Sequence, residues 1–204
     1  NIYTLNGIQN FEELRYLSCI GNNLEILPNL PNKLAELYCQ KNLLAELPNL
    51  PSGLKYLDCS NNCLINLPTL PYNLQYLACQ SNYLNQLNTS FLTELKTLLA
   101  YDNNLTSINV FGCINLIELD CHNNRLNSLN TSNLVYLKKL NAYCNAIKTL
   151  DVSQCVNLKM IDIHNNVTSS IDIKALRCSC YCKVDCFSNK SNVSSIFINN
   201  VENI

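Results

Sequence analysis

The sequence has few charged residues and no cluster of basic ones. Asp, Glu, Lys and Arg make up 14% of the 204 residues, and the formal net charge is −1 at pH 7. Proteins that bind nucleic acid gather Lys and Arg on one face, where they neutralise phosphates. The basic residues of this chain are spread along its length, so nucleic acid is not an expected partner.

The sequence also lacks a long apolar segment. A helix that crosses a bilayer needs about 18 or more consecutive apolar residues, and a secretory signal needs a basic start followed by an apolar run. Neither pattern occurs, so we expect no membrane insertion. The first residue is Asn and not Met, which leads us to expect a fragment or processed form from which an export signal could have been removed.

What the sequence has in abundance is leucine at regular intervals. From Leu14, "LRYLSCIGNNLEILPNLPNK" is followed by "LAELYCQKNLLAELPNLPSG" and "LKYLDCSNNCLINLPTLPYN". A unit of this size cannot bury its own apolar edge, so successive units stack into a solenoid. The template L-x-x-L-x-C-x-x-N-x-L-x-x-L begins at Leu14, Leu34, Leu54, Leu74, Leu95, Leu116, Leu137 and Leu158.

This template resembles the leucine-rich repeat over nearly the whole chain. The resemblance implies the α/β-solenoid class, mostly β: a horseshoe with short parallel strands on the concave face and irregular or extended convex segments. We expect a single domain. It would comprise a partial N-terminal repeat over 1–13, eight repeats over 14–178, and a degenerate ninth repeat with a closing segment over 179–204.

All six prolines fall in three "LPxLP" phrases between residues 27 and 71. Proline fixes φ and has no N–H, which suits an extended convex segment without ladder hydrogen bonds. A PxxP ligand for an SH3-type domain is the alternative. The 20-residue unit over 27–74 resembles the repeats of bacterial effectors of the YopM and IpaH type. The later 21-residue units resemble repeats of bacterial surface proteins.

Two columns of residues are expected inside the solenoid. The asparagine of each repeat can satisfy backbone donors and acceptors where the chain leaves the strand. The cysteine column alternates with Ala and Ile, which indicates small buried hydrophobes, with redox or metal roles as the alternative. The inward pairs are Leu17/Cys19, Leu37/Cys39, Leu57/Cys59, Leu77/Cys79, Leu98/Ala100, Leu119/Cys121, Leu140/Ala142 and Ile161/Ile163.

Four further cysteines lie in "RCSCYCKVDC", residues 177–186. In the repeat register, Cys178 and Cys186 take inward positions of the ninth repeat. Cys180 and Cys182 are left over as a C-x-C pair, which lacks the four-ligand spacing of a structural zinc site. Free thiols, a disulfide and metal binding remain the three alternatives for this pair.

The concave face is the expected binding surface. Tyrosines gather on its first four strands, and exposed tyrosine offers apolar area and a hydroxyl at low entropic cost. The alternative is that tyrosine simply suits a strand face. The expected partner-binding residues are Tyr16, Tyr38, Tyr56, Asp58, Tyr76, Tyr101, Asp120, His122, Tyr143, Asp162 and His164.

The only two histidines each follow an aspartate on this face, Asp120 with His122 and Asp162 with His164. Carboxylate and imidazole could share a metal ion or a proton. The two pairs lie two repeats apart, about 10 Å, which is too far for one ion. We therefore favour a polar binding surface over a metal or catalytic role and expect no cofactor, metal or catalytic residue.

These features favour a non-catalytic module that binds a protein partner on its concave surface, as a bacterial effector or its targeting domain. The alternatives are a bacterial surface or adhesion protein, and the substrate-recognition part of a ubiquitin ligase whose catalytic domain has no match here. The 13 cysteines, most of them at packing positions, favour a reducing compartment such as bacterial cytoplasm or host cytosol. The cell surface is the alternative location.

Overall fold

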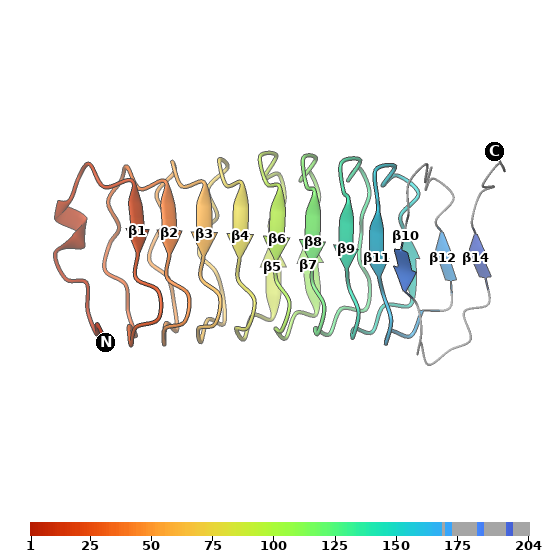
Figure 1. Ribbon diagram of the computed structural model, residues 1–204, viewed down its shortest axis with the longest axis horizontal. Helices are drawn as coiled ribbons and strands as arrows, with labels where there is room; N and C mark the ends of the chain where they lie inside the picture. The colour runs from red at the N-terminus through yellow and green to blue at the C-terminus, as the bar shows by residue number, and fades with distance from the viewer. Residues whose placement is uncertain (169, 173–182, 186–194, 198–204) are drawn as a thin grey trace.

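The computed structural model describes residues 1–168 and, beyond them, three strands at 170–172, 183–185 and 195–197. Each repeat forms one turn, and the turns stack side by side along one axis (Figure 1). The structure is a mostly β parallel solenoid with one short 3-10 helix, η1 (Ile8–Asn10), in the described residues. The leucine-rich repeat solenoid predicted from the sequence is confirmed.

One strand from each turn contributes to a nine-stranded parallel sheet. Its strands pair without a slip in register, so the central residue of each lies opposite the central residue of the next, as in the pair Leu17 and Leu37. In order they are β1 (Tyr16–Ser18), β2 (Glu36–Tyr38), β3 (Tyr56–Asp58), β4 (Tyr76–Ala78), β6 (Thr97–Leu99), β8 (Glu118–Asp120), β9 (Lys139–Asn141), β11 (Met160–Asp162) and β13 (Lys183–Asp185).

The alternation of each strand decides which side faces the core. In this sheet, the central leucine or isoleucine of every strand from β1 to β11 is buried, and so is the Cys, Ala or Ile that follows each of these strands. Side chains alternate across a strand, so the residues on either side of the central one point outward. The cysteines of this column are packing residues, since Cys39, Cys59, Cys79 and Cys121 are fully buried free thiols.

The asparagine column closes the turn after each strand. The Asn62 side chain donates to the carbonyls of Cys39 and Cys59 at 3.1 Å each, and its Oδ1 accepts the Leu44 N–H at 3.0 Å. The same pattern recurs at Asn82 and Asn103. Each asparagine therefore links its own turn to the preceding one, which agrees with the structural role that the sequence predicts.

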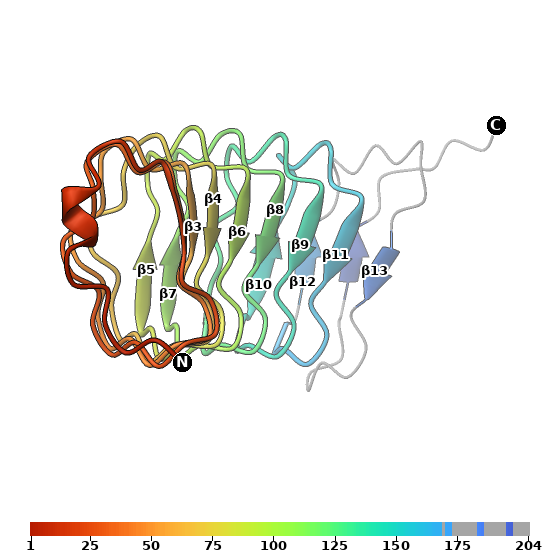
Figure 2. The same cartoon turned by 60° about the vertical axis from the view of Figure 1, so that its left-hand side comes forward.

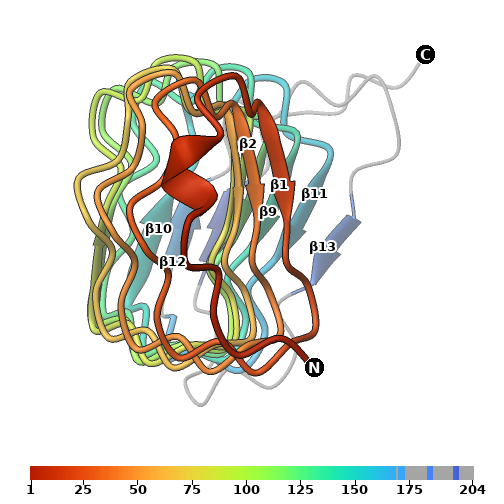
Figure 3. The ribbon, with the colours of Figure 1, turned by 90° about the vertical axis from the view of Figure 1, so that its left-hand side faces the viewer.

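A second row of strands lies on the opposite side of the turn, which the sequence did not predict (Figures 2 and 3). One sheet pairs β5 (Gln86–Asn88) with β7 (Ser107–Asn109). The other contains β10 (Thr149–Asp151), β12 (Ser170–Asp172) and β14 (Ser195–Phe197). All five strands occur after the last proline, and proline lacks the N–H that a ladder needs. The proline-free residues 128–130 form no strand, and they separate the two sheets.

The two ends of the chain continue the stack. At the N-terminus Leu5 and Ile8 are half-buried against the first repeat, and the Ile2 N–H donates to Asn22 Oδ1 at 2.8 Å. At the other end β13 pairs with β11, with Val184 opposite Ile161. Cys178, Cys180, Cys182 and Cys186 lie outside the described residues, and the repeat boundaries stay a prediction.

Candidate functional site

The candidate site is the outward side of the nine-stranded sheet, which we call the strand face. It comprises the first and third residues of each strand and the second residue after the end of the strand, for example Tyr16, Ser18 and Ile20 in β1. In β1–β4 the tyrosines form two ring pairs. Tyr16 and Tyr38 have ring centroids 5.4 Å apart, and Tyr56 and Tyr76 stack at 6.4 Å. The structure therefore brings together the four tyrosines that the sequence places on neighbouring strands.

Polar neighbours hold these tyrosines in place. The Tyr38 hydroxyl donates to Glu36 Oε2 at 3.1 Å, and the Tyr56 hydroxyl donates to Gln75 Oε1 at 3.4 Å. Burial, followed by the hydrogen bond to Glu36, raises the pKa of Tyr38 to about 12. Its hydroxyl thus stays a neutral donor and acceptor at any physiological pH.

Asp58 lies on the same face, and its carboxylate already accepts hydrogen bonds within the chain. Its Oδ1 accepts the Ser60 backbone N–H at 3.0 Å and the Ser60 hydroxyl at 2.7 Å. This local turn fixes the carboxylate on β3 beside Tyr76, whose pKa is raised by burial and then by the charge of Asp58. Asp58 therefore contributes fixed negative charge to the tyrosine cluster.

Further along the sheet, four rings form one continuous stack. Tyr101, His122, Tyr143 and His164 come from successive turns, and consecutive ring centroids are 4.4, 4.3 and 4.5 Å apart. The ring planes are within 15° of parallel. The spacing of about 4.8 Å between parallel strands is close to the centroid separation of offset-stacked aromatic rings, so rings at the same position of successive turns can stack.

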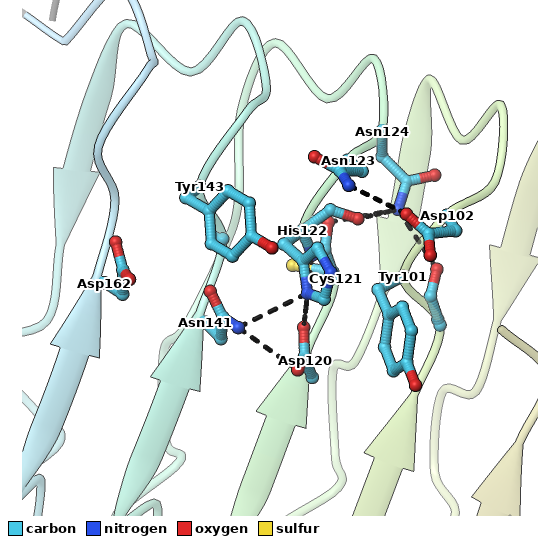
Figure 4. Close-up of polar contacts among 12 residues, drawn as sticks. Tyr101, Asp102, Asp120, Cys121, His122, Asn123, Asn124, Asn141, Tyr143 and Asp162 are labelled. Atoms are coloured by element: carbon cyan, nitrogen blue, oxygen red, sulfur yellow. Dashed lines mark hydrogen bonds and ion pairs between the residues drawn. The ribbon is translucent and has the colours of Figure 1, made fainter. Parts of the chain in front are cut away.

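Each histidine of the stack is oriented by an aspartate. His122 Nδ1 lies 2.5 Å from Asp120 Oδ1, and His164 Nδ1 lies 2.5 Å from Asp162 Oδ1. Asn141 joins the first pair, since its amide donates to Asp120 Oδ2 at 3.2 Å (Figure 4). These contacts fix both the position and the plane of the imidazoles.

The stack separates the two histidines. The Tyr143 ring lies between His122 and His164, so the two imidazoles make no direct contact. Within the described residues, no group of three or more His, Cys, Asp and Glu side chains is arranged to hold a metal ion. The two pairs are therefore separate elements of one column of stacked rings.

Tyr and His alternate at one position of four successive repeats, and this alternation is the sequence signal that could have predicted the ring stack. The sequence placed these residues on the same face without predicting ring stacking. The role of Asn141 was also missed, because an amide bond to the neighbouring turn depends on side-chain rotamers.

Within the described residues, no helix has the length and apolar character required to cross a bilayer. The nine cysteines of this part are free thiols. Burial raises the pKa of Cys19 to about 11 and that of Cys79 to about 12. These thiols therefore remain protonated at neutral pH.

The motif and the solenoid together define a protein of the leucine-rich repeat class. By sequence, no family model and no curated protein matches the chain. Several of the solved structures to which it is similar are bacterial proteins. YopM of Yersinia pestis, a leucine-rich effector protein, has 30% identity and a TM-score of 0.75, and the match covers 86% of this chain and 49% of that one.

Two further structures support the same class. The functional domain of InlJ from Listeria monocytogenes, which includes a cysteine ladder, has 28% identity and a TM-score of 0.75 over 85% of this chain and 42% of that one. A Shigella effector LRR domain has 26% identity and a TM-score of 0.55 over 92% and 77%. The chain thus spans about half the length of the YopM and InlJ structures.

Proposed function

We propose that this chain is a non-catalytic recognition module that binds a protein partner on its strand face. The observation that carries the proposal is the pre-ordered aromatic surface, formed by two tyrosine pairs on β1–β4 and the stack from Tyr101 to His164. A surface whose side chains are already held in place loses little entropy on binding. Aromatic residues of this kind are the usual anchors of interfaces.

The size of the surface supports a protein partner. Eight steps between nine strands, at about 4.8 Å each, extend roughly 40 Å along the solenoid. Interfaces of specific complexes bury about 800 Å² on each partner, which a face of this length can supply. The sheet is continuous over this length, because its nine strands pair in one register.

Two of the similar structures are named as effector proteins, and the proline-containing repeats resemble theirs. We therefore propose that the chain is a bacterial effector or its targeting domain, acting in a reducing compartment such as the host cytosol. The second candidate is a bacterial surface or adhesion protein. It is favoured by the 21-residue repeats that begin at Leu74 and Leu95, which resemble those of bacterial surface proteins.

Capture experiments with matched variants test the strand face. The unchanged protein, a Tyr38→Ala/Tyr56→Ala/Tyr76→Ala variant and a Tyr3→Ala/Tyr83→Ala/Tyr136→Ala variant are immobilised and exposed to extracts of bacterial and host cells. The control tyrosines are exposed and lie outside the nine-stranded sheet. We expect the strand-face variant alone to lose the specific partner, by 10-fold or more, since interface tyrosines contribute about 1.4 kcal/mol or more each.

Equal recovery of the partner by all three proteins would refute binding on the strand face. The compartment is tested separately by titrating thiols in denaturant after isolation under conditions that block exchange. Mostly reduced cysteines are expected for a reducing compartment, and mostly oxidised ones would favour the cell surface.

A further inference from the structure

A cleft opens on the back of the solenoid where the proline repeats meet the second row of strands. The last "LPTLP" phrase, residues 67–71, lies next to β5, the first strand of that row. The sheet order shows β5 paired with β7 alone, so the edge of β5 that faces the prolines has no strand partner in the described residues (Figure 2). Pro68 has no N–H with which to extend the ladder across the junction.

The cleft between the two segments has a volume of about 870 Å³, within the range of small-molecule sites. Its floor is apolar. Leu67 and Leu70 are only half-buried there, whereas Leu27 and Leu47, which occupy the position of Leu67 in earlier repeats, are buried. At the position of Leu67, the junction therefore leaves uncovered a part of the core that the earlier proline repeats close.

The walls of the cleft carry hydrogen-bonding groups and no charge. None of the residues that line it is Asp, Glu, Lys, Arg or His. The side chains of Asn66, Thr69, Gln86 and Ser107 make no hydrogen bond within residues 1–168. Asn88 and Asn109 use Oδ1 to accept the backbone N–H groups of Ser90 and Phe111, which leaves their amide donors free. The cleft thus offers neutral amides and hydroxyls that are not already paired.

Two exposed aromatic rings stand at the cleft. Tyr72 is 76% exposed and Phe91 is 58% exposed, and both line it. Phe111 supports Phe91 from the next turn, with the ring centroids 5.4 Å apart and the planes at 88°. Exposed rings beside a polar cleft are platforms on which an apolar face of a ligand can lie.

The backbone of Phe91 adopts a conformation that is unfavourable for an aromatic residue. Phe91 has φ of 63°, in the left-handed region, and the equivalent positions of the next two repeats carry Gly112 at 80° and Asn133 at 66°. Glycine and asparagine adopt this region readily, whereas a bulky aromatic residue rarely does. Strained residues of this kind concentrate at binding sites.

We propose that this cleft binds a neutral oligosaccharide, independently of the strand face. Sugar rings present vicinal hydroxyls, which planar amides such as those of Gln86 and Asn109 bind in pairs, and apolar C–H faces, which stack on rings such as those of Tyr72 and Phe91. The lining has no positively charged side chain that could neutralise the negative charge of an acidic sugar or a phosphate. An extended peptide added to the free edge of β5 fits less well, because that edge is three residues long.

Calorimetry tests the proposal with neutral tetrasaccharides of glucose, mannose, galactose and N-acetylglucosamine as probes. We expect at least one to bind with a dissociation constant of about 1 mM or tighter, with an affinity that is the same in low and high salt. The variants Tyr72→Ala, Phe91→Asn and Gln86→Ala should each weaken binding by about 5-fold or more. The control Tyr83→Ala removes an equally exposed ring outside the cleft and should bind as the unchanged protein does.

Phe91→Asn distinguishes loss of binding from loss of fold, because asparagine already occupies this position at Asn133. We expect it to melt no lower than the unchanged protein while losing the sugar. The proposal is overturned if no tetrasaccharide binds at about 10 mM, or if binding is unaffected by the Tyr72 and Phe91 changes. It is also overturned if an uncharged extended peptide, and no sugar, binds in the cleft. The strand-face tyrosine variant should bind sugar normally, so failure of either proposal leaves the other intact.

Discussion

At the scale of single residues, two small side chains explain why the turns stack. The Asn62 amide bonds to carbonyls of two turns and its oxygen accepts from a third position, so one side chain satisfies several buried backbone groups. The Cys column takes a buried apolar side chain in every repeat, and Ala100, Ala142 and Ile163 occupy it where cysteine does not. Neither residue type is reactive here, since the thiols are buried and the amides are engaged.

The buried thiols predict a loss of stability in alkaline solution. Burial raises the pKa of Cys79 to about 12 from its ordinary value of 9.0, so the folded state keeps a proton that the unfolded chain releases. This stabilisation is complete below pH 9, and it is lost as the pH rises toward about 12. Each such thiol should lower the free energy of unfolding by about 1.4 kcal/mol per pH unit in that interval.

Urea denaturation at several pH values from about 8 to 10.5 measures this slope. The variant Cys79→Ala carries the residue found at Ala100. Its free energy of unfolding should fall less steeply with pH, by the contribution of one titrating thiol. An unchanged slope in the variant would contradict the assignment of the effect to Cys79.

At the scale of elements, the turns that contain proline carry no second strand in the described residues, and most of the proline-free turns carry one. The "QLN", "SIN" and "TLD" segments of the later repeats form β5, β7 and β10, whereas the "LPxLP" segments form none in the described residues. The repeat period, the main strands and the inward columns could be predicted from the sequence, because they follow from a 20-residue or 21-residue period of apolar residues. The second row could not, because the repeat resemblance implies irregular or extended backbone there, and equivalent segments differ, since 107–109 forms a strand and 128–130 does not.

The same limit applies to the candidate sites. The residues of the strand face followed from the register, but the ring stack depends on rotamers and on spacing between turns. The cleft forms where the last "LPxLP" phrase, residues 67–71, lies next to β5. These two segments belong to successive repeats, so no local sequence pattern predicts their junction. Tyr72 and Phe91 were not predicted as site residues for this reason.

The aromatic stack should behave as one element. Tyr143 contacts a histidine ring on each side, at 4.3 and 4.5 Å. We expect Tyr143→Ala to lower the free energy of unfolding by about 2 kcal/mol, since it removes partly buried aromatic area and two ring contacts. Tyr136→Ala, at an exposed position without a ring contact in the described residues, should change it by less than about 0.5 kcal/mol.

Chemical denaturation followed by circular dichroism gives both values. Histidine side-chain signals in NMR spectra provide an independent readout, because His122 and His164 should each lose the ring-current shift from Tyr143. Equal effects of the two tyrosine variants would show that the stack contributes nothing beyond surface area.

At the scale of the whole molecule, each turn contacts only its neighbours, so stability should be local. Leu98 is fully buried at the centre of β6. We expect Leu98→Ala to cost about 2 to 5 kcal/mol and to reduce hydrogen-exchange protection most in residues 74–136. Protection of β1 and β2 should change much less.

Hydrogen exchange followed by mass spectrometry resolves this distribution. Leu43→Ala, at an exposed position, is the control and should leave the protection pattern unchanged. A uniform loss of protection along the chain would mean that the solenoid unfolds as one cooperative unit instead.

The uninterrupted register of the nine-stranded sheet has a consequence for how such a protein can change. The period lengthens from 20 to 21 residues at Leu74, yet Tyr76 still lies opposite Thr97, so the extra residue is absorbed away from the strand face. Gene duplication or deletion of either type of unit would therefore lengthen or shorten the strand face in steps of one strand. The ligand preferences at neighbouring positions would be left intact. The number of repeats thus sets the length of the strand face without changing the surface of the repeats that remain.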